Sequence, residues 1–322
     1  MAVYTKIDKK DLLTLSNNYE LGKIIKCMGI KKGIENTNYF LKTNKKKFIL
    51  TIFEKRVKKK DLPFFMNLME KLNEKKIICP RPLKNRNSKH LSKIKSKPAS
   101  IVTFLTGADK TNLNYKNCFD IGKNVAKFHK ATAKIKLHRE NSMSINKLGV
   151  LLKSIKFKSN KISLKLIPTL NTCLKDIKNQ WPKQLPSGII HGDLFIDNIF
   201  FNKNKFSGFI DFYFSSNDYL MYEIAICINS LCFDKKRNSF KINHKKVKSL
   251  INGYETIRSF TKKEKDALNT LCRGAALRYL LTRIYDYFNT PKTALIKIKD
   301  PNEYFQKLIF HNNLNSYKDY YK

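Results

Sequence analysis

Cysteine is sparse in this sequence, and no two cysteines have the CxxC spacing of a metal or redox site. The seven cysteines are Cys27, Cys79, Cys118, Cys173, Cys227, Cys232 and Cys272. Their odd number and wide scatter exclude a disulfide scaffold and a zinc ribbon, and they predict a protein of the reducing cytoplasm.

Long hydrophobic runs are also missing. No apolar stretch approaches the roughly 18 residues that span a bilayer, and the N-terminal MAVYTKIDKK is polar, so we expect neither a membrane helix nor a signal peptide, and no membrane partner.

Acidic residues are few: 25 Asp and Glu stand against 65 Lys and Arg, which gives a formal net charge of +40. A strong positive charge is typical of nucleic-acid-binding proteins, because Lys and Arg replace the counterions of phosphates. Only nine of the 65 cations are arginine, however, and the arginine fork is the group that base recognition and tight phosphate binding favour. The lysine runs, such as 55–60 and 153–165, are spread over the whole chain. We therefore interpret the charge as solvated surface and expect no specific nucleic-acid partner; a non-catalytic basic nucleic-acid-associated protein is the remote alternative.

Glycine and proline are also few, with 11 and 9 residues, whereas 42% of the chain is hydrophobic and 12% is aromatic. This composition excludes a disordered or collagen-like chain, and 322 residues are enough to bury a sizeable core. Two common glycine-rich phosphate-binding patterns, GxGxxG and GxxxxGK[ST], are absent from the sequence. The sequence therefore predicts neither a Rossmann nor a Walker-type nucleotide site.

Hydrophobic periodicity divides the chain into two parts. Up to Leu105 the pattern is strand-rich, and beyond Gly107 it is mostly helical. The predicted elements are strands over 38–42, 47–53 and 101–105 and helices over 62–73, 118–132 and 267–288. We therefore predict an α+β fold with an N-terminal lobe, residues 1–105, and a larger helical C-terminal lobe, residues 106–322.

One short β-rich segment interrupts the helical part and carries the polar residues of greatest chemical interest. A strand over 188–190 is followed by a polar loop from His191 to Asp197, and a hairpin over 198–210 then ends at Asp211. The hairpin places Asn198, at the start of its first strand, near Asp211, at the end of its second. Asp193 lies five residues before Asn198. Two oxygen ligands and a nearby carboxylate are what Mg²⁺-dependent phosphoryl transfer requires; polar groups that merely cap a hairpin are the alternative.

The pattern His191-x-Asp193-x-x-x-x-Asn198, followed by Asp211, resembles the catalytic loop of the protein-kinase-like superfamily in its aminoglycoside and choline phosphotransferase form. The resemblance implies a bilobal fold with the active site in the cleft between the lobes. It also implies that Asp193 orients and deprotonates the acceptor hydroxyl, that His191 orders the catalytic loop, and that Asn198 and Asp211 bind the Mg²⁺ of Mg·ATP.

The same resemblance implies that the N-terminal lobe binds ATP. The candidate ATP-binding residues are Gly33, Asn36, Thr37, Asn38, Lys55, Arg56, Glu70, Thr103 and Leu105. The first four lie at the bend of a phosphate-covering loop, and Thr103 to Leu105 form the strand whose backbone reads adenine. Thr51 stands where the phosphate-binding lysine is expected, so either Lys55 or Arg56 supplies the charge or the loop acts alone. Glu70 is the candidate partner acid, with a solvent-facing helix charge as the alternative.

A narrower resemblance extends from residue 1 to about 311. The blocks GIENTNYFL, FILTIFEKRV, DLPFFMNLMEKL, IIHGDLFIDNIFF, SGFIDFYF and RGAALRYLLTRIYDYFNTP are similar to the bacterial homoserine kinases of this phosphotransferase-like type. The resemblance implies ATP-dependent phosphorylation of the L-homoserine hydroxyl to O-phospho-L-homoserine, a step of threonine biosynthesis. The sequence departs from the family pattern at Glu223, where Asp is usual, and at Ser230-Leu231. Another phosphotransferase of this fold, acting on choline, an aminoglycoside or another amino alcohol, is the alternative.

A zwitterionic amino-acid alcohol requires a cation for its carboxylate and an acid for its ammonium group. The candidate substrate-binding residues in the C-terminal lobe are Asp218, Glu223, Arg273, Arg278 and Arg283. Because steps of five residues rotate about 140° around a helix, the three arginines cannot all face one pocket. Asp218 and Glu223 are the candidate acids; a helix cap is the alternative role for Asp218.

Overall fold

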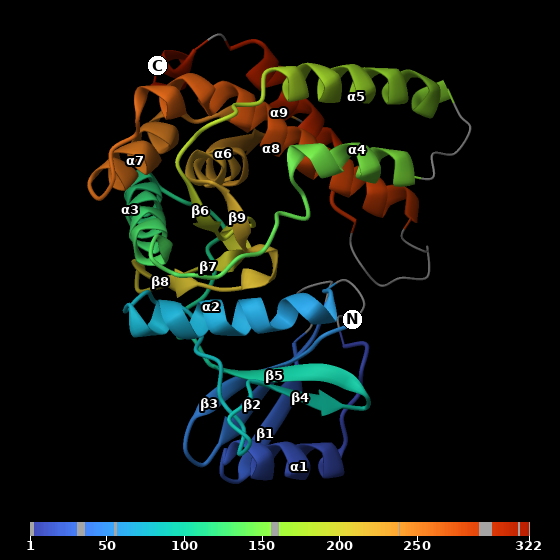
Figure 1. The fold of residues 1–322 in the computed structure, drawn as a ribbon, viewed down its shortest axis with the longest axis vertical. Coiled ribbons are helices and arrows are strands. Elements are labelled where there is room, and N and C mark those ends of the chain that lie inside the picture. Colours follow the sequence, from blue (N-terminus) through green and yellow to red (C-terminus); the bar gives the residue numbers. More distant parts are fainter. Residues whose placement is uncertain are drawn as a thin grey trace. The chain divides into compact units, whose positions relative to one another are not determined.

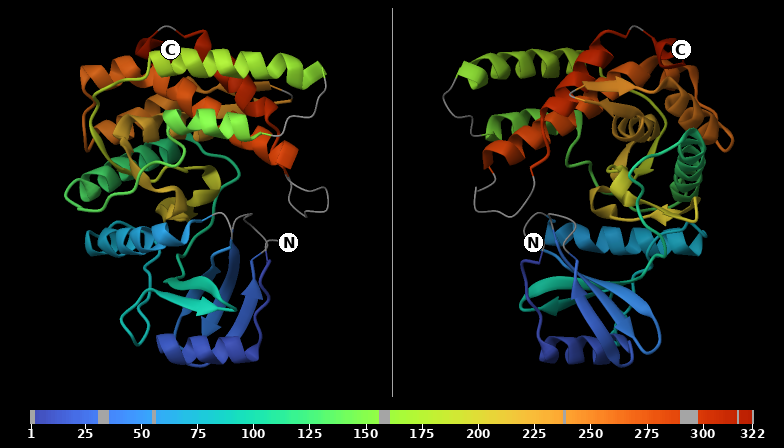
Figure 2. Two further views of the ribbon diagram at one scale, coloured as in Figure 1. Left: turned by 45° about the vertical axis from the view of Figure 1, so that its right-hand side comes forward. Right: turned by 180° about the vertical axis from the view of Figure 1, so that it is seen from behind.

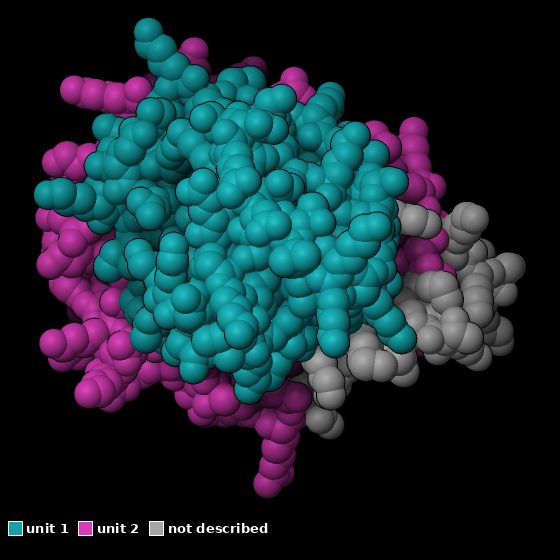
Figure 3. Space-filling view, turned by 90° about the horizontal axis from the view of Figure 1, so that it is seen from below, with its two compact units in different colours: residues 1–107, 135–139, 207–213 teal, residues 108–134, 140–206, 214–322 magenta. Residues whose placement is uncertain are grey.

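The computed structural model describes residues 3–30, 36–54, 57–155, 161–237, 239–289, 298–314 and 316–321, and the side chains of 161–165 are not described. The chain divides into two compact units (Figure 3). Unit 1 comprises residues 1–107, 135–139 and 207–213, and unit 2 comprises residues 108–134, 140–206 and 214–322. No helix in the described part of the chain is both long enough and apolar enough to cross a membrane.

Unit 1 is built on a five-stranded antiparallel sheet in the order β1-β2-β3-β5-β4 (Figure 1). Its elements are α1 (Lys9–Tyr19), β1 (Ile24–Gly29), β2 (Thr37–Thr43), β3 (Lys47–Ile52), η1 (Lys59–Asp61), α2 (Leu62–Glu74), β4 (Leu91–Ile94) and β5 (Lys97–Thr103). The sequence patterns predicted β2, β3, β5 and α2 to within a few residues, and they missed α1, β1 and β4.

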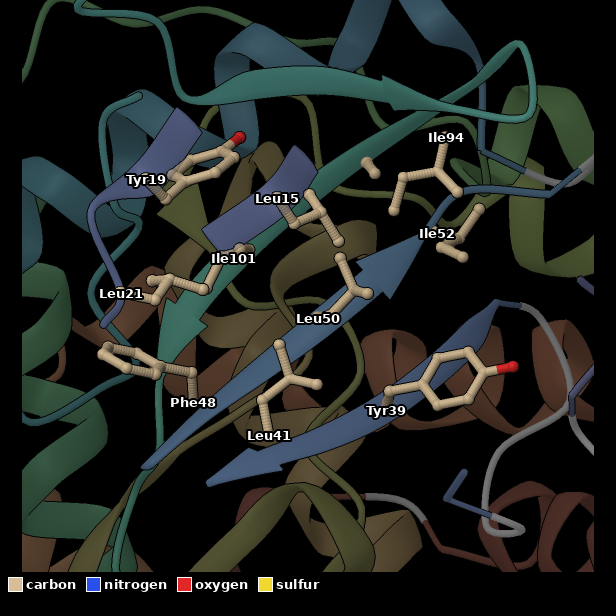
Figure 4. Packing of buried hydrophobic residues seen from close by; sticks show 11 residues of the cluster. Leu15, Tyr19, Leu21, Tyr39, Leu41, Phe48, Leu50, Ile52, Ile94 and Ile101 are labelled. Carbon is tan, nitrogen blue, oxygen red and sulfur yellow. The ribbon is translucent and has the colours of Figure 1, made fainter. Parts of the chain in front are cut away.

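One apolar cluster of unit 1 lies between α1 and the sheet. Burial alternates along β2, because successive side chains of a strand point to opposite faces. Tyr39 and Leu41 of β2 therefore join Leu50 of β3 and Ile101 of β5 in one apolar cluster, which Leu15 of α1 covers (Figure 4). An Asp8–Asp11 capping box begins α1 by satisfying two backbone N–H groups at its first turn. The helix thus starts where its apolar side chains can reach the sheet.

Unit 2 is mostly helical, with short two-stranded sheets. Its elements are α3 (Tyr115–Thr132), α4 (Ile145–Ser154), α5 (Lys161–Asn179), β6 (Ser187–Ile190), η2 (Ile196–Asn198), β7 (Ile199–Asn202), β9 (Ser216–Tyr219), α6 (Leu220–Leu231), β10 (Phe233–Lys236), β11 (Ser239–Ile242), α7 (His244–Glu255), α8 (Lys262–Asn289), α9 (Asn302–Asn312) and η4 (Tyr317–Tyr321). Two further elements, β8 (Lys205–Phe209) and η3 (Phe212–Phe214), have residues in both units. The 28-residue α8 is the central helix of unit 2, since α4, α5, α6 and α9 all pack against it (Figure 2).

The predicted division into residues 1–105 and 106–322 did not anticipate two short segments that pack into unit 1. Arg139, from the segment 135–139, forms an ion pair of 2.8 Å with Asp61 and lies over the ring of Phe65. Tyr213, from the segment 207–213, packs edge-on against Phe53 and Phe65. Sequence periodicity reports only local structure, so it cannot show that a distant segment returns to an earlier core.

Glycine allows α3 and α7 to pack with their backbones in contact. A Cβ atom at Gly122 of α3 would overlap the carbonyl oxygen of Leu250, and one at Gly253 of α7 would overlap that of Phe119. The two glycines therefore form a reciprocal contact that no larger residue permits without moving one helix. Gly149 in α4 differs, because a Cβ there would meet only side-chain atoms, at 3.6 and 3.7 Å.

Gly122→Ala is expected to lower the free energy of unfolding by about 2 kcal/mol, because the added methyl group overpacks a backbone contact. The matched control is Gly149→Ala, which should raise stability by up to about 1 kcal/mol, since alanine is the better helix former where space is available. Urea denaturation followed by circular dichroism measures both changes. Equal effects from the two substitutions would contradict the close approach of α3 and α7.

Candidate active site

The loop between β6 and β7 makes a sharp turn at Gly192. Its φ angle is +77°, a conformation that residues with a side chain rarely adopt. An added Cβ would also lie only 2.8 Å from the carbonyl oxygen of Phe214. Gly192 thus leaves room for the turn that places the following residue, Asp193, at the start of the polar loop.

The carboxyl group of Glu223, on α6, accepts hydrogen bonds from the backbone of this turn. The backbone N–H of His191 donates a hydrogen bond to Glu223 Oε2, and the N–H of Gly192 donates to Oε1 at 3.1 Å. Glu223 is completely buried, and burial raises the pKa of its carboxyl group to about 8, although the two N–H donors act in the opposite direction. Glu223 was one of two candidate acids for the substrate's ammonium group; the structure instead turns both of its oxygens to the loop backbone.

Two serine hydroxyls satisfy carbonyl groups of the same loop. Ser215 donates to the carbonyl oxygen of His191 at 3.3 Å, and Ser230 donates to that of Leu194 at 2.6 Å. Ser230 occupies a position at which the sequence departs from the homoserine kinase pattern. His191 is 1% exposed, and its backbone N–H and C=O both have partners, as a loop-ordering residue requires.

Asp193 and Asn198 are in direct contact at the other side of the loop. The Nδ2 group of Asn198 donates to the backbone oxygen of Asp193 at 2.8 Å and to its carboxylate Oδ2 at 3.2 Å. These two bonds use the NH₂ end of the amide, so the Oδ1 atom of Asn198 is turned away from Asp193. An amide oxygen is a ligand that Mg²⁺ accepts. One side chain thereby orients the candidate base and presents a hard oxygen.

Asp211 lies in the part of unit 1 that follows β8, whereas Asn198 belongs to unit 2. The φ angle of Asp211 is +65°, which is uncommon for a residue other than glycine and costs about 1–3 kcal/mol. Residues that keep such strain are concentrated at functional sites. Its exposed carboxylate has the oxygen chemistry that Mg²⁺ prefers.

The three arginines of α8 have different surroundings. Arg273 bonds to Asp176, to Gln180 and to Asn312, so its guanidinium connects three polar surface groups. Arg283 forms an ion pair of 2.7 Å with Glu303 and donates to the carbonyl oxygen of Asp300 at 2.8 Å. Helical rotation thus directs two of the three predicted substrate ligands to structural partners.

Arg278 is the exception. It is 2% exposed, and its Nε and Nη1 atoms have no hydrogen-bond partner within the described part of the chain. Its guanidinium lies 4.8 Å from the ring centre of Tyr279 and 5.7 Å from that of Phe214. Burial of guanidinium N–H groups without acceptors is costly, so these two nitrogen atoms make Arg278 the candidate among the three arginines for binding an anionic group.

Asp218, at the end of β9, is held on both of its oxygens. The amide of Asn141 donates to Oδ2 at 2.6 Å, and the backbone N–H of Tyr219 donates to Oδ1 at 2.7 Å. Burial raises the pKa of Asp218, and the charge of Arg278 acts against this rise. Asn141 was not identified from the sequence, because it is 77 residues from Asp218 and belongs to no recognisable motif.

The candidate ATP-binding residues are described in part. Gly33, Lys55 and Arg56 lie outside the described residues, so the source of the phosphate-binding charge stays a prediction. The buried Thr51 donates its hydroxyl to Asn38 Oδ1 at 2.8 Å and thereby fixes that side chain.

Glu54, just after β3, organises the two candidates that precede Asn38. The hydroxyl of Thr37 donates to Glu54 Oε1 at 2.7 Å, and Asn36 Oδ1 accepts from the N–H of Glu54 at 3.3 Å. An ion pair with Lys97 holds the other carboxylate oxygen of Glu54. These contacts order the strand end at which the predicted phosphate-covering loop finishes.

The remaining candidates lie on α2 and after β5. Glu70 forms an ion pair of 2.6 Å with Lys84 and contacts His90 at 3.2 Å. The cations considered for it, Lys55 and Arg56, lie outside the described residues, so its role as a partner acid stays a prediction. Thr103 is the last residue of β5, and its N–H donates to the carbonyl oxygen of Arg81 at 2.9 Å. Leu105, two residues later, is half-buried.

Comparison with known proteins places the chain in a family. Residues 26–246 match the family model described as the phosphotransferase enzyme family. Curated homoserine kinases from Paramagnetospirillum magneticum and Rhizobium meliloti are each 41% identical to the chain over 320 residues. The matches cover 98% and 99% of this chain, respectively, and 97% of each relative. The chain belongs to the homoserine kinase family. The family predicted from the sequence is therefore confirmed, as a branch of the phosphotransferase enzymes.

Solved structures confirm the predicted fold class. An amicoumacin kinase, solved in complex with AMP-PNP, Ca²⁺ and Ami, has a TM-score of 0.73 at 12% identity, covering 95% of this chain and 92% of that one. A choline kinase from Streptococcus pneumoniae has a TM-score of 0.64 at 15% identity, covering 95% and 99%. At these identities the likeness shows the fold alone, which is the α+β fold of the phosphotransferases.

The buried carboxyl of Glu223 predicts a specific pH dependence of stability. Its pKa is about 8 in the folded protein, against an ordinary value of 4.5. Between these two pKa values the folded protein keeps a proton that the unfolded chain has lost. The contribution of Glu223 to the free energy of unfolding therefore decreases as the pH rises from the lower pKa to the higher one.

Glu223→Gln removes this ionisation. The melting temperature of the wild type should therefore fall relative to that of the variant between about pH 5 and about pH 8. The variant itself should be less stable at low pH, because its amide NH₂ faces a backbone N–H donor. Thermal unfolding followed by circular dichroism across this range measures both effects, and parallel curves for the two proteins would contradict the prediction.

Proposed function

We propose that this protein is an ATP-dependent homoserine kinase, which transfers the γ-phosphoryl group of ATP to the side-chain hydroxyl of L-homoserine. The supporting observation is a loop in which Asn198 donates to Asp193 and Glu223 accepts from the loop backbone, within a chain about 40% identical to curated homoserine kinases over nearly its whole length. The seven free thiols support a reducing compartment such as the cytoplasm as its location.

Asp193 is the proposed base. Its carboxylate accepts the proton of the acceptor hydroxyl as the oxygen–phosphorus bond forms and the bond from the γ-phosphorus to the bridging oxygen of ADP breaks. Phosphoryl transfer gains most of its rate from positioning and electrostatics, so a fixed carboxylate is the main contribution of this loop.

Asn198 and Asp211 are the proposed ligands of Mg²⁺. The fit rests on the donor set, since the Oδ1 atom of Asn198 is directed away from Asp193 and Asp211 offers an exposed carboxylate. When bound, Mg²⁺ neutralises charge on the phosphates of ATP. In unit 1, the residues proposed to contact ATP are Gly33, Asn36, Thr37, Asn38, Lys55, Arg56, Thr103 and Leu105.

Arg278 and Asp218 are proposed to bind the two charged ends of homoserine. The carboxylate of the substrate would supply the acceptors that Arg278 Nε and Nη1 lack in the described chain. Asp218 keeps further acceptor capacity beyond its bonds to Asn141 and to the Tyr219 N–H, and it is the proposed partner of the ammonium group.

Asp193→Asn tests the base. The amide cannot accept the proton of the hydroxyl, so kcat should fall by at least about a hundredfold, while the affinity for Mg·ATP stays unchanged. Asp197→Asn is the matched control, because it removes the same charge from the same loop and should retain activity within about threefold. Coupled ADP-release assays and calorimetry provide the two measurements, and near-normal turnover of Asp193→Asn would refute the assignment.

Arg278→Ala tests the carboxylate site together with the substrate. The wild type should prefer L-homoserine to 3-aminopropan-1-ol, which lacks the carboxylate, by about 10- to 100-fold in kcat/KM, because the alcohol leaves the Nε and Nη1 atoms of Arg278 without acceptors. Arg278→Ala should lose this preference, mainly through a higher KM for homoserine. Arg273→Ala is the control that should keep it.

Two outcomes would contradict the proposal in different ways. An unchanged preference in Arg278→Ala would place the carboxylate site elsewhere and leave the homoserine kinase activity standing. Indifference of the wild type to L-homoserine, combined with robust phosphorylation of choline or an aminoglycoside, would refute the proposed substrate.

A further inference from the structure

Tyr279, which follows Arg278 on α8, is packed so that its hydroxyl has a fixed direction. The residue is 6% exposed. Its ring centre lies 4.8 Å from that of Phe195, in an edge-to-face arrangement, and 5.2 Å from that of Tyr304. The guanidinium of Arg278 lies 4.8 Å from the ring centre. With aromatic rings and a cation around it, the ring has little freedom to rotate or tilt.

The hydroxyl of Tyr279 reaches the catalytic loop at two atoms. It lies 3.3 Å from the carbonyl oxygen of Gly192 and 3.4 Å from Oδ1 of Asp193. One phenolic proton is therefore shared between two acceptors, which accounts for the length of both contacts. Hydrogen bonds of catalytic groups are often long without substrate and shorten in the reacting complex.

The two oxygens of Asp193 thus have different side-chain donors. Asn198 donates to Oδ2 at 3.2 Å from within the loop, and Tyr279 approaches Oδ1 from α8. Gly192 is also held at both ends, since its N–H donates to Glu223 and its carbonyl faces Tyr279. A second donor on the other oxygen opposes rotation of the carboxylate about its side-chain bonds.

We propose that Tyr279 is a positioning residue for phosphoryl transfer, whose hydroxyl fixes the carboxylate of Asp193 in the orientation that faces the acceptor hydroxyl. This inference rests on the proposed role of Asp193 as the base. Tyr279 does not touch the reacting atoms; it acts through Asp193 and through the carbonyl of Gly192. A misplacement of about 1 Å in a reacting group can cost on the order of a hundredfold in rate, so one hydroxyl can have a large effect on kcat.

Tyr304 provides the matched control in the same aromatic cluster. It is fully buried, its ring packs against that of Tyr279, and its hydroxyl has no hydrogen-bond partner among the described residues. Tyr279→Phe and Tyr304→Phe each remove one oxygen atom and keep the ring. Only the first substitution removes a donor from the catalytic loop, so a difference between them reports that donor and not the packing.

The experiment compares kcat, the KM values for homoserine and Mg·ATP, and the melting temperature of the wild type and both variants. Tyr279→Phe should lower kcat by about 10- to 100-fold while both KM values stay within about threefold, because binding groups are untouched and only the base is misplaced. Tyr304→Phe should keep the kcat of the wild type. Both variants should melt within a few degrees of the wild type.

Crystal structures of the three proteins without substrate give a second readout that does not depend on the substrate. Asp193 should have one side-chain conformer in the wild type and in Tyr304→Phe, and more than one in Tyr279→Phe. Equal kcat values for Tyr279→Phe and the wild type, or one unchanged conformer of Asp193 in Tyr279→Phe, would overturn the positioning role. A wild type that does not phosphorylate homoserine would refute the proposed substrate, and the crystallographic comparison would still decide whether Tyr279 fixes Asp193.

Discussion

The hydrogen bonds from the backbone of His191 and Gly192 to the buried Glu223 carboxyl are the interaction on which the rest of the site depends. A loop that leaves its strand with a positive φ angle at Gly192 has N–H groups that no neighbouring strand can pair. Left without acceptors inside the protein, each would cost about 1–3 kcal/mol. Glu223 accepts from both N–H groups. The turn then places Asp193 within hydrogen-bonding distance of the Asn198 side chain.

The same requirement explains why the loop receives side chains from several separate elements. Ser215, Ser230 and Tyr279 approach the carbonyl groups of His191, Leu194 and Gly192. Ser215 directly precedes β9, Ser230 lies on α6 and Tyr279 lies on α8. The loop is therefore ordered only when these elements of unit 2 have packed together. A catalytic geometry built in this way is a property of the packed unit and not of the loop sequence alone.

Sequence reasoning succeeded where the information is local. The spacing of His191, Asp193 and Asn198 fits within one loop, and α2, α3 and α8 follow from hydrophobic periodicity. It failed for contacts between distant residues. Glu223 was recognised as a site residue, but the sequence does not show that its carboxyl group is buried and accepts hydrogen bonds from the loop backbone. Tyr279, 86 residues from Asp193, belongs to no motif that would reveal its contact.

Arg278 and Arg283 show how burial distinguishes a structural arginine from a ligand-binding one. They lie on one helix and are 2% and 8% exposed, so removal from water is costly for both. For Arg283, an ion pair with Glu303 and a hydrogen bond to the carbonyl oxygen of Asp300 offset the cost of desolvation. The Nε and Nη1 atoms of Arg278 have no such acceptors within the described chain. This difference is why Arg278, and not Arg283, is the proposed ligand of the substrate's carboxylate, a group with the charge and the planar geometry that match a guanidinium.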